Sequence, residues 1–128
     1  MADAGIFTIS PEKSFSMCKE EKNYLDYVYC LTGLVITVSE NNPDKAIELC
    51  QKINENCSYS YNRNYNLEGE KFPIRMRVIN ENEYFYGKTE CLVSIMGVLK
   101  EKYPDKLSQV CGMICPGTSG YSGIECHP

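Results

Sequence analysis

The first third of the chain carries apolar residues at the three- and four-residue steps that are typical of an amphipathic helix. Ser10 followed by Pro11 predicts the start of this helix, because a hydroxyl caps the first turn and proline is favoured at the first helical position. We expect one helix that runs to about Val38, or two helices joined near Asn23. The apolar positions are Phe15, Cys18, Leu25, Val28, Leu31, Leu34, Val35 and Val38.

A second pair of cap and proline, Asn42 and Pro43, predicts a short helix that ends near Asn54. Its apolar stripe consists of Ala46, Ile47, Cys50 and Ile53. Because few residues separate the two helical patterns, we expect them to form an antiparallel hairpin.

A similar pattern returns in the second half of the chain. Asn80 or Asn82 is the expected cap of a helix that ends near Lys102, and Pro104 is expected to begin a last helix. The residues expected to face inward are Tyr84, Cys91, Leu92, Ile95, Met96 and Leu99 in the first of these helices, and Leu107, Val110, Cys111 and Ile114 in the second.

Residues 30–54 match residues 91–115 at an offset of 61 positions. The identical pairs are Cys30/Cys91, Leu31/Leu92, Glu40/Glu101, Pro43/Pro104, Asp44/Asp105, Lys45/Lys106, Cys50/Cys111 and Ile53/Ile114. The sequence therefore predicts a mostly helical fold made of two related helical hairpins, an internal duplication within a single domain over residues 1–128. The related halves span about residues 11–57 and 80–126.

Between the hairpins, apolar and basic residues alternate with the two-residue period of a half-buried strand. The apolar members are Ile74, Met76 and Val78, and the basic members are Arg75 and Arg77. We expect a short strand over residues 72–79 and a loop over the polar residues 58–71. The glycine-rich C-terminal tail, residues 116–128, is expected to supply a partner strand, because its glycines permit tight turns.

Eight cysteines in 128 residues indicate disulfide bonds and an oxidising compartment, so we expect a secreted or extracellular protein. A zinc site is the competing interpretation. It is disfavoured because no Cys-x2-Cys pair occurs and the single histidine, His127, is the penultimate residue. We therefore expect no metal.

Helical geometry suggests a pairing of the cysteines. In the first hairpin, Cys30 and Cys50 each lie about eight residues from the turn, which is roughly 12 Å at a rise of 1.5 Å per residue. Equal heights favour a bond between them, and the repeat extends the argument to the second hairpin. The four predicted pairs are Cys30–Cys50, Cys91–Cys111, Cys18–Cys57 and Cys115–Cys126.

The charge of the chain argues against two classes of partner. Binding to nucleic acid or to an anionic membrane draws its affinity from clustered basic residues, whereas this chain has a net charge of −4. The most apolar region, residues 24–38, is interrupted by Asp26 and is shorter than a membrane-spanning helix requires, so we expect no membrane insertion.

Motifs for catalysis are also missing from the sequence. One histidine cannot run a two-histidine mechanism, and neither a glycine-rich phosphate loop nor a Gly-x-Ser-x-Gly elbow occurs. Paired carboxylates for sugar cleavage are the remaining alternative. We interpret the candidates as solvated helix faces and expect a non-enzymatic protein without a cofactor. They are Glu20, Glu21, Asp26, Glu40, Glu68, Glu70, Glu81, Glu83, Glu90 and Glu101.

The ten tyrosines point to recognition instead. Residues 58–66 interleave Tyr, Ser and Asn in a composition typical of binding loops, and Tyr and Arg often dominate interface energetics. We expect a secreted ligand, effector, toxin-like or immunomodulatory protein that binds an extracellular protein or receptor. The partner-binding candidates are Tyr59, Tyr61, Arg63, Tyr65, Arg75 and Arg77. The other interpretation of residues 58–66 is a polar linker whose rings fold back onto the helices.

A second functional class stays open, an extracellular carrier of a small hydrophobic ligand. Several helices can enclose a cavity, and the candidate lining residues are Leu34, Ile36, Met96 and Met113. The sequence also contains a formal glycosylation site at Asn56-Cys57-Ser58 and does not decide whether it is used.

Overall fold

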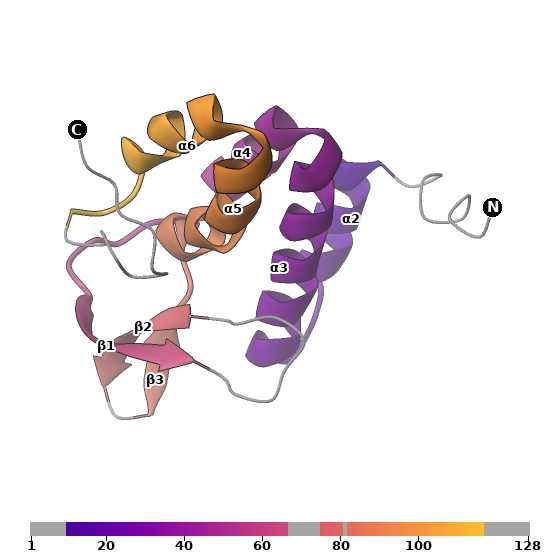
Figure 1. Cartoon of the computed structure of the whole chain (residues 1–128). Helices are drawn as coiled ribbons and strands as arrows, with labels where there is room; N and C mark the ends of the chain where they lie inside the picture. The colour runs from indigo at the N-terminus through magenta and orange to yellow at the C-terminus, as the bar shows by residue number, and fades with distance from the viewer. Residues whose placement is uncertain (1–9, 67–74, 81, 117–128) are drawn as a thin grey trace.

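The structure is a computed structural model that describes residues 10–66, 75–80 and 82–116. It confirms a mostly helical fold. The elements in chain order are α2 (Pro11–Lys19), α3 (Tyr24–Asn41), α4 (Pro43–Gln51), β1 (Ser60–Asn66), β2 (Arg75–Asn80), β3 (Glu83–Phe85), α5 (Lys88–Lys102) and α6 (Pro104–Cys111). Figure 1 shows the helices packed together, with the small sheet at one end of the bundle, below α5 and beside the lower end of α3.

The helices α2 and α4 begin where the capping residues predict them, and α3 begins at the expected junction near Asn23. The Ser10 hydroxyl accepts a hydrogen bond from the Lys13 amide at 3.1 Å, and the Asn42 side chain accepts one from the Lys45 amide at 3.1 Å. The Asn23 side chain caps the first turn of α3 in the same way. The chain therefore forms two separate helices in its first third.

The two helical hairpins, α3–α4 and α5–α6, turn with nearly the same backbone geometry. The turn residue has φ −147° and ψ 77° at Asn42, and φ −139° and ψ 65° at Tyr103. Pro43 and Pro104 then occupy the first helical position, as predicted. The turns also lie against each other, because the Tyr103 hydroxyl donates to the Glu40 carbonyl at 2.7 Å.

The predicted start of α5 is wrong. The helix begins after Gly87 rather than after Asn80 or Asn82, because residues 83–85 form strand β3 and pair with β2. Gly87 fits this junction for a steric reason. A Cβ there would clash with the Phe85 ring and lie 2.8 Å from the carbonyl oxygen of Asn54.

The sheet is antiparallel with the strand order β1-β2-β3. The predicted strand is confirmed as β2, whereas the predicted loop over residues 58–71 is wrong at residues 60–66, which form β1. The local pattern gave no signal of strand pairing, because residues 60–66 place two tyrosines among polar residues and contain no aliphatic residue. The proposed partner strand at residues 117–128 lies outside the described residues.

All four predicted disulfide pairs are wrong. The observed pairs are Cys18–Cys30, Cys50–Cys91 and Cys57–Cys115. Cys111 is also disulfide-bonded, and Cys126 lies outside the described residues. Height along a hairpin was not sufficient to predict pairing. Cys30 bonds to α2 and Cys50 bonds to α5, so neither reaches across its own hairpin.

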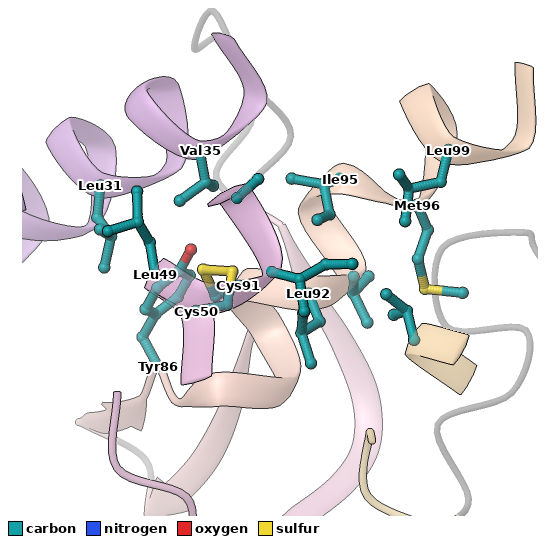
Figure 2. Close-up of a cluster of buried hydrophobic side chains, with 14 of the residues drawn as sticks. Leu31, Val35, Leu49, Cys50, Tyr86, Cys91, Leu92, Ile95, Met96 and Leu99 are labelled. Carbon is teal, nitrogen blue, oxygen red and sulfur yellow. A yellow bond between two sulfur atoms is a disulfide. The ribbon is translucent and has the colours of Figure 1, made fainter. Parts of the chain in front are cut away.

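The Cys50–Cys91 bond lies inside the hydrophobic core and joins the two hairpins, as Figure 2 shows. The surrounding side chains come from α3, α4 and α5, with Tyr86 at the sheet end of the cluster. The fully buried ones include Leu31, Val35, Leu49, Leu92, Ile95 and Leu99. Burying each such side chain contributes about 1.5–3 kcal/mol of transfer free energy. Among the described helices, none has the length and apolar character needed to span a membrane.

Candidate binding groove

An open groove of about 880 Å³ lies where the first turn of α3 meets the sheet. Its walls come from the ends of α2 and α4, from α3, and from the β2–β3 hairpin. Aromatic rings dominate the lining: Tyr24, Tyr27, Tyr59, Tyr84, Phe85 and Tyr86. The aliphatic lining residues are Leu25, Ile53, Met76 and Ile79.

Hydrogen bonds and ring contacts hold several of these rings in place. The Tyr24 hydroxyl accepts from the Tyr86 amide at 2.8 Å, and the Tyr86 hydroxyl lies 2.8 Å from the Thr32 hydroxyl. Burial raises the pKa of both tyrosines, so both stay neutral across the physiological range. Tyr59 meets the Phe85 ring edge-on at 5.1 Å between centroids. These contacts make part of the groove wall preorganised.

Part of the apolar lining faces solvent. The exposed fractions are 46% for Tyr24, 40% for Leu25 and 38% for Ile79. Single exposed apolar residues are ordinary, but a cluster of them around a hollow is typical of a binding site. The groove is therefore the strongest candidate for a functional site in the part of the chain that the structure describes.

The charged residues of the groove are arranged unevenly. Lys19 and Lys52 line the end formed by α2 and α4, and their ammonium groups lie 5.5 and 6.0 Å from the centroid of the Phe15 ring. Glu83 lines the part formed by the β2–β3 hairpin, where its carboxylate accepts a hydrogen bond from the Asn80 side chain at 2.5 Å. One part of the groove is cationic and another is anionic.

A buried ion-pair cluster, defined by Arg77, Glu55, Glu90 and Thr89, lies next to the groove. The Arg77 side chain is fully buried and holds the Glu90 carboxylate with two hydrogen bonds, Nε to Oε2 at 2.5 Å and Nη2 to Oε1 at 2.8 Å. It also donates to the Glu55 carboxylate and to the Asn56 carbonyl. This arrangement satisfies the demand that a buried charge be paired and hydrogen-bonded.

The same cluster caps helix α5. Glu90 accepts from the Gly87 amide at 2.9 Å, and Glu55 accepts from the Thr89 amide at 2.7 Å and from the Thr89 hydroxyl at 2.5 Å. Two carboxylates therefore lie at the positive end of the helix dipole, where negative charge is stabilising. The cluster fastens the loop after α4 to the start of α5.

The two carboxylates respond differently to this environment. Burial tends to raise the pKa of Glu55, but the hydrogen bonds from Thr89 and Arg77 outweigh it and lower the pKa below the ordinary value. For the more deeply buried Glu90, burial dominates and raises the pKa, although the Arg77 guanidinium opposes the change. The cluster is thus a structural unit whose charges are engaged inside the protein.

The structure places the predicted partner-binding residues in different parts of the molecule. Tyr59 lines the groove, Tyr61, Arg63 and Tyr65 lie on β1, and Arg75 begins β2. Assigning Arg77 to a contact surface is wrong, because its side chain is fully buried. The candidate lining residues of a carrier cavity belong to the hydrophobic core or pack against it, and none of them lines the groove: Leu34, Ile36, Met96 and Met113.

Sequence reasoning missed most of the groove and the cluster. Glu90 was interpreted as part of a solvated helix face, yet it is 2% exposed. A signal was present, since an acid three residues after Gly87 fits the N3 position of a capping box. The groove had no comparable signal, because its walls come from segments spread between Lys19 and Tyr86.

Glu55, Cys57 and Cys115 also gather their ligand atoms within 4.8 Å of one another. Such a set has the composition of a metal site. However, the two sulfurs are bonded to each other in the Cys57–Cys115 disulfide, so neither is a thiolate that could bind a metal ion. We interpret Glu55, Cys57 and Cys115 as part of the set of contacts that holds the start of α5 in place.

The comparisons with known proteins give no indication of function, so a functional proposal has to start from the groove. The chain matches no protein-family model, no curated protein and no solved structure.

Proposed function

We propose that this protein is secreted and non-enzymatic, and that it recognises an extracellular protein through the groove and the adjoining strand β1. The observation that carries the proposal is the gathering of six aromatic residues around one solvent-exposed hollow. Tyrosines supply large contact areas at a modest entropic cost, and they are enriched among the residues that dominate interface energetics.

Two further features support this role. The three described disulfides are typical of proteins in an oxidising compartment, where they make a scaffold durable. Strand β1 is at the edge of the described sheet and carries the segment rich in Tyr and Asn. An edge strand can pair with an extended segment of a partner by main-chain hydrogen bonds.

The test is a screen of the folded protein against a panel of purified extracellular domains, followed by affinity measurement on any domain that binds. We expect the double variant Tyr59→Ala and Ile79→Ala to bind at least about tenfold more weakly, since loss of a central contact residue costs over 1 kcal/mol. Lys100→Ala, an exposed change on α5, is the control and should bind like the wild type. Equal binding by the double variant would contradict the assignment of the surface.

A second candidate function is the transport of a small apolar ligand. The volume of the groove favours it, because about 880 Å³ lies within the range of roughly 300–1,000 Å³ that is usual for small-molecule sites. The solvent exposure of the lining instead favours a macromolecular partner. Both candidates assign binding to the same surface.

We also propose that the two hairpins descend from one duplicated unit. The support is the pair of matching turns at Asn42 and Tyr103, each followed by proline at the same helical position. The disulfides do not follow the repeat, since Cys50 bonds to Cys91. Shared turn geometry with divergent cross-links is the expected result of duplication followed by specialisation of each half.

A further inference from the structure

We propose that the groove binds an amphipathic carboxylate, such as a medium-chain fatty acid, with the carboxylate at Lys19 and Lys52 and the apolar body along the aromatic wall. The inference rests on the second candidate function, transport of a small ligand, and names the chemical class of that ligand. Three features of the groove carry it.

The first feature is the pair of lysines at one end. Both are exposed, both line the groove, and both ammonium groups lie within 6.0 Å of the centroid of the same ring, that of Phe15. Within the described part of the chain neither forms a salt bridge, whereas Lys45 binds Glu12 and Glu48 directly. The hydrogen bond from Lys45 lowers the pKa of the Glu12 carboxyl, and the charge of the nearby Lys52 helps to lower it. Each ammonium group can bind an anionic head group through a charge-assisted hydrogen bond.

The second feature is the wall between the charged regions. The hydroxyl of Tyr24 is already hydrogen-bonded inside the protein and the residue is exposed, so its ring offers carbon surface to a ligand. Leu25 and Ile79 add exposed aliphatic surface. An alkyl chain gains free energy from covering such a surface.

The third feature is Glu83, which lines the groove on the β2–β3 hairpin. Its carboxylate would repel an anionic head group, and the lysines would attract it. Two lysines against one carboxylate favour an anionic head group, and the position of Glu83 fixes the direction in which the ligand lies. The volume of about 880 Å³ is sufficient for a chain of this kind.

The test compares three ligands that share a ten-carbon chain: decanoate, decan-1-ol and decyltrimethylammonium. The protein contains ten tyrosines and no tryptophan, so tyrosine fluorescence and titration calorimetry both report binding. We expect one equivalent of decanoate to bind at least about tenfold more tightly than decan-1-ol, because hydrogen bonds to charged groups are the stronger ones. Decyltrimethylammonium should bind more weakly than the alcohol.

The deciding variant is the double change Lys19→Gln and Lys52→Gln. Decanoate affinity should fall about tenfold, to the level of decan-1-ol, while affinity for the alcohol stays unchanged. The matched control is Lys13→Gln and Lys100→Gln, which removes the same charge from two exposed lysines that do not line the described groove. Circular dichroism verifies that each variant is folded.

Three results would overturn the inference: no binding of decanoate by the wild type, equal affinity for decanoate and the alcohol, or an equal loss in the matched control. These results are independent of the protein-recognition proposal, which depends on the Tyr59 and Ile79 variant in the partner screen. If a partner protein binds through the groove and decanoate does not, the inference is wrong and the recognition proposal stands.

Discussion

The groove and the buried ion-pair cluster are adjacent, and Phe85 belongs to the wall of one and contacts the other. They differ in what they bury: the cluster buries charged side chains, whereas the groove exposes apolar side chains to solvent. In the cluster, Arg77 is fully buried, donates to two carboxylates and lies 4.8 Å from the centroid of the Phe85 ring. In the groove, Ile79 is 38% exposed. A buried charge with a full set of partners stabilises a fold, whereas exposed apolar surface around a hollow is available for binding.

This difference separates stability from function within one short stretch of sequence. Changes in the cluster should lower the free energy of unfolding and affect binding only as a consequence. Changes in the groove should reduce binding and leave the fold intact. The predictions below test that separation, from the largest expected change in the free energy of unfolding to the smallest.

Arg77→Met should have the largest effect. It leaves Glu90 and Glu55 buried without their guanidinium, and removing one partner of a buried ion pair costs about 3–5 kcal/mol. Urea denaturation followed by circular dichroism measures the loss. Adding Glu90→Gln should recover part of it, because the more deeply buried carboxylate then carries no charge. A loss below about 1 kcal/mol for Arg77→Met would show that the cluster is not structural.

Gly87→Ala should cost about 1–3 kcal/mol, because the added methyl group overlaps the Phe85 ring and approaches the backbone carbonyl of Asn54. Gly97→Ala is the matched control. No neighbouring atom lies within 4 Å of a Cβ at that exposed helix position, so this change should be neutral or stabilising. Thermal unfolding of both variants gives the comparison, and equal shifts would contradict the steric account.

Glu55→Gln should cost about 1–3 kcal/mol at neutral pH, since it weakens a charged hydrogen-bond partner of Arg77. The pKa of Glu55 is lowered in the folded protein, so its ionised form stabilises the fold above the ordinary value of 4.5. That stabilisation is lost as the pH falls through the lowered value. The gap in unfolding free energy between wild type and variant should therefore shrink from pH 7 to about pH 3. A constant gap would argue against the assigned direction.

Ile79→Thr should have the smallest effect on stability, within about 0.5 kcal/mol, because the side chain is already exposed. It should nevertheless weaken decanoate binding several-fold, since it removes apolar surface from the groove wall. Calorimetric titration and urea denaturation on the same sample give both quantities. Unchanged binding would remove Ile79 from the site.

Local signals in the sequence predicted much of the helical part of the fold. The caps at Ser10, Asn23 and Asn42 act on amides within the next turn, so their meaning does not depend on tertiary structure. The prolines at positions 43 and 104 similarly fix the starts of α4 and α6. These local rules held for α2, α4 and α6 and failed for α5, where the expected cap at Asn80 or Asn82 lies in or beside the β2–β3 hairpin.

The errors concern features that depend on distant residues. Helix α5 begins at Lys88 because β3 pairs with β2, and Glu90 is buried because Arg77 comes from another element. The disulfide partner of a cysteine depends on which face of the helix it occupies, and that face is set by the packing of three or more helices. Composition alone singled out Tyr59, which lines the groove, while Arg77 was assigned to the surface because arginine usually lies there.

The most direct test of the central claim is an NMR titration of the protein, labelled with ¹⁵N and at isoleucine methyl groups, with decanoate. If the groove is the binding element, signals of Leu25, Lys52 and Ile79 will shift together and saturate at one equivalent, while those of Glu55 and Thr89 in the buried cluster will barely move. Shifts centred on Glu55 and Thr89 would contradict the account of the groove, and no shifts at all would contradict the inference that the groove binds a carboxylate.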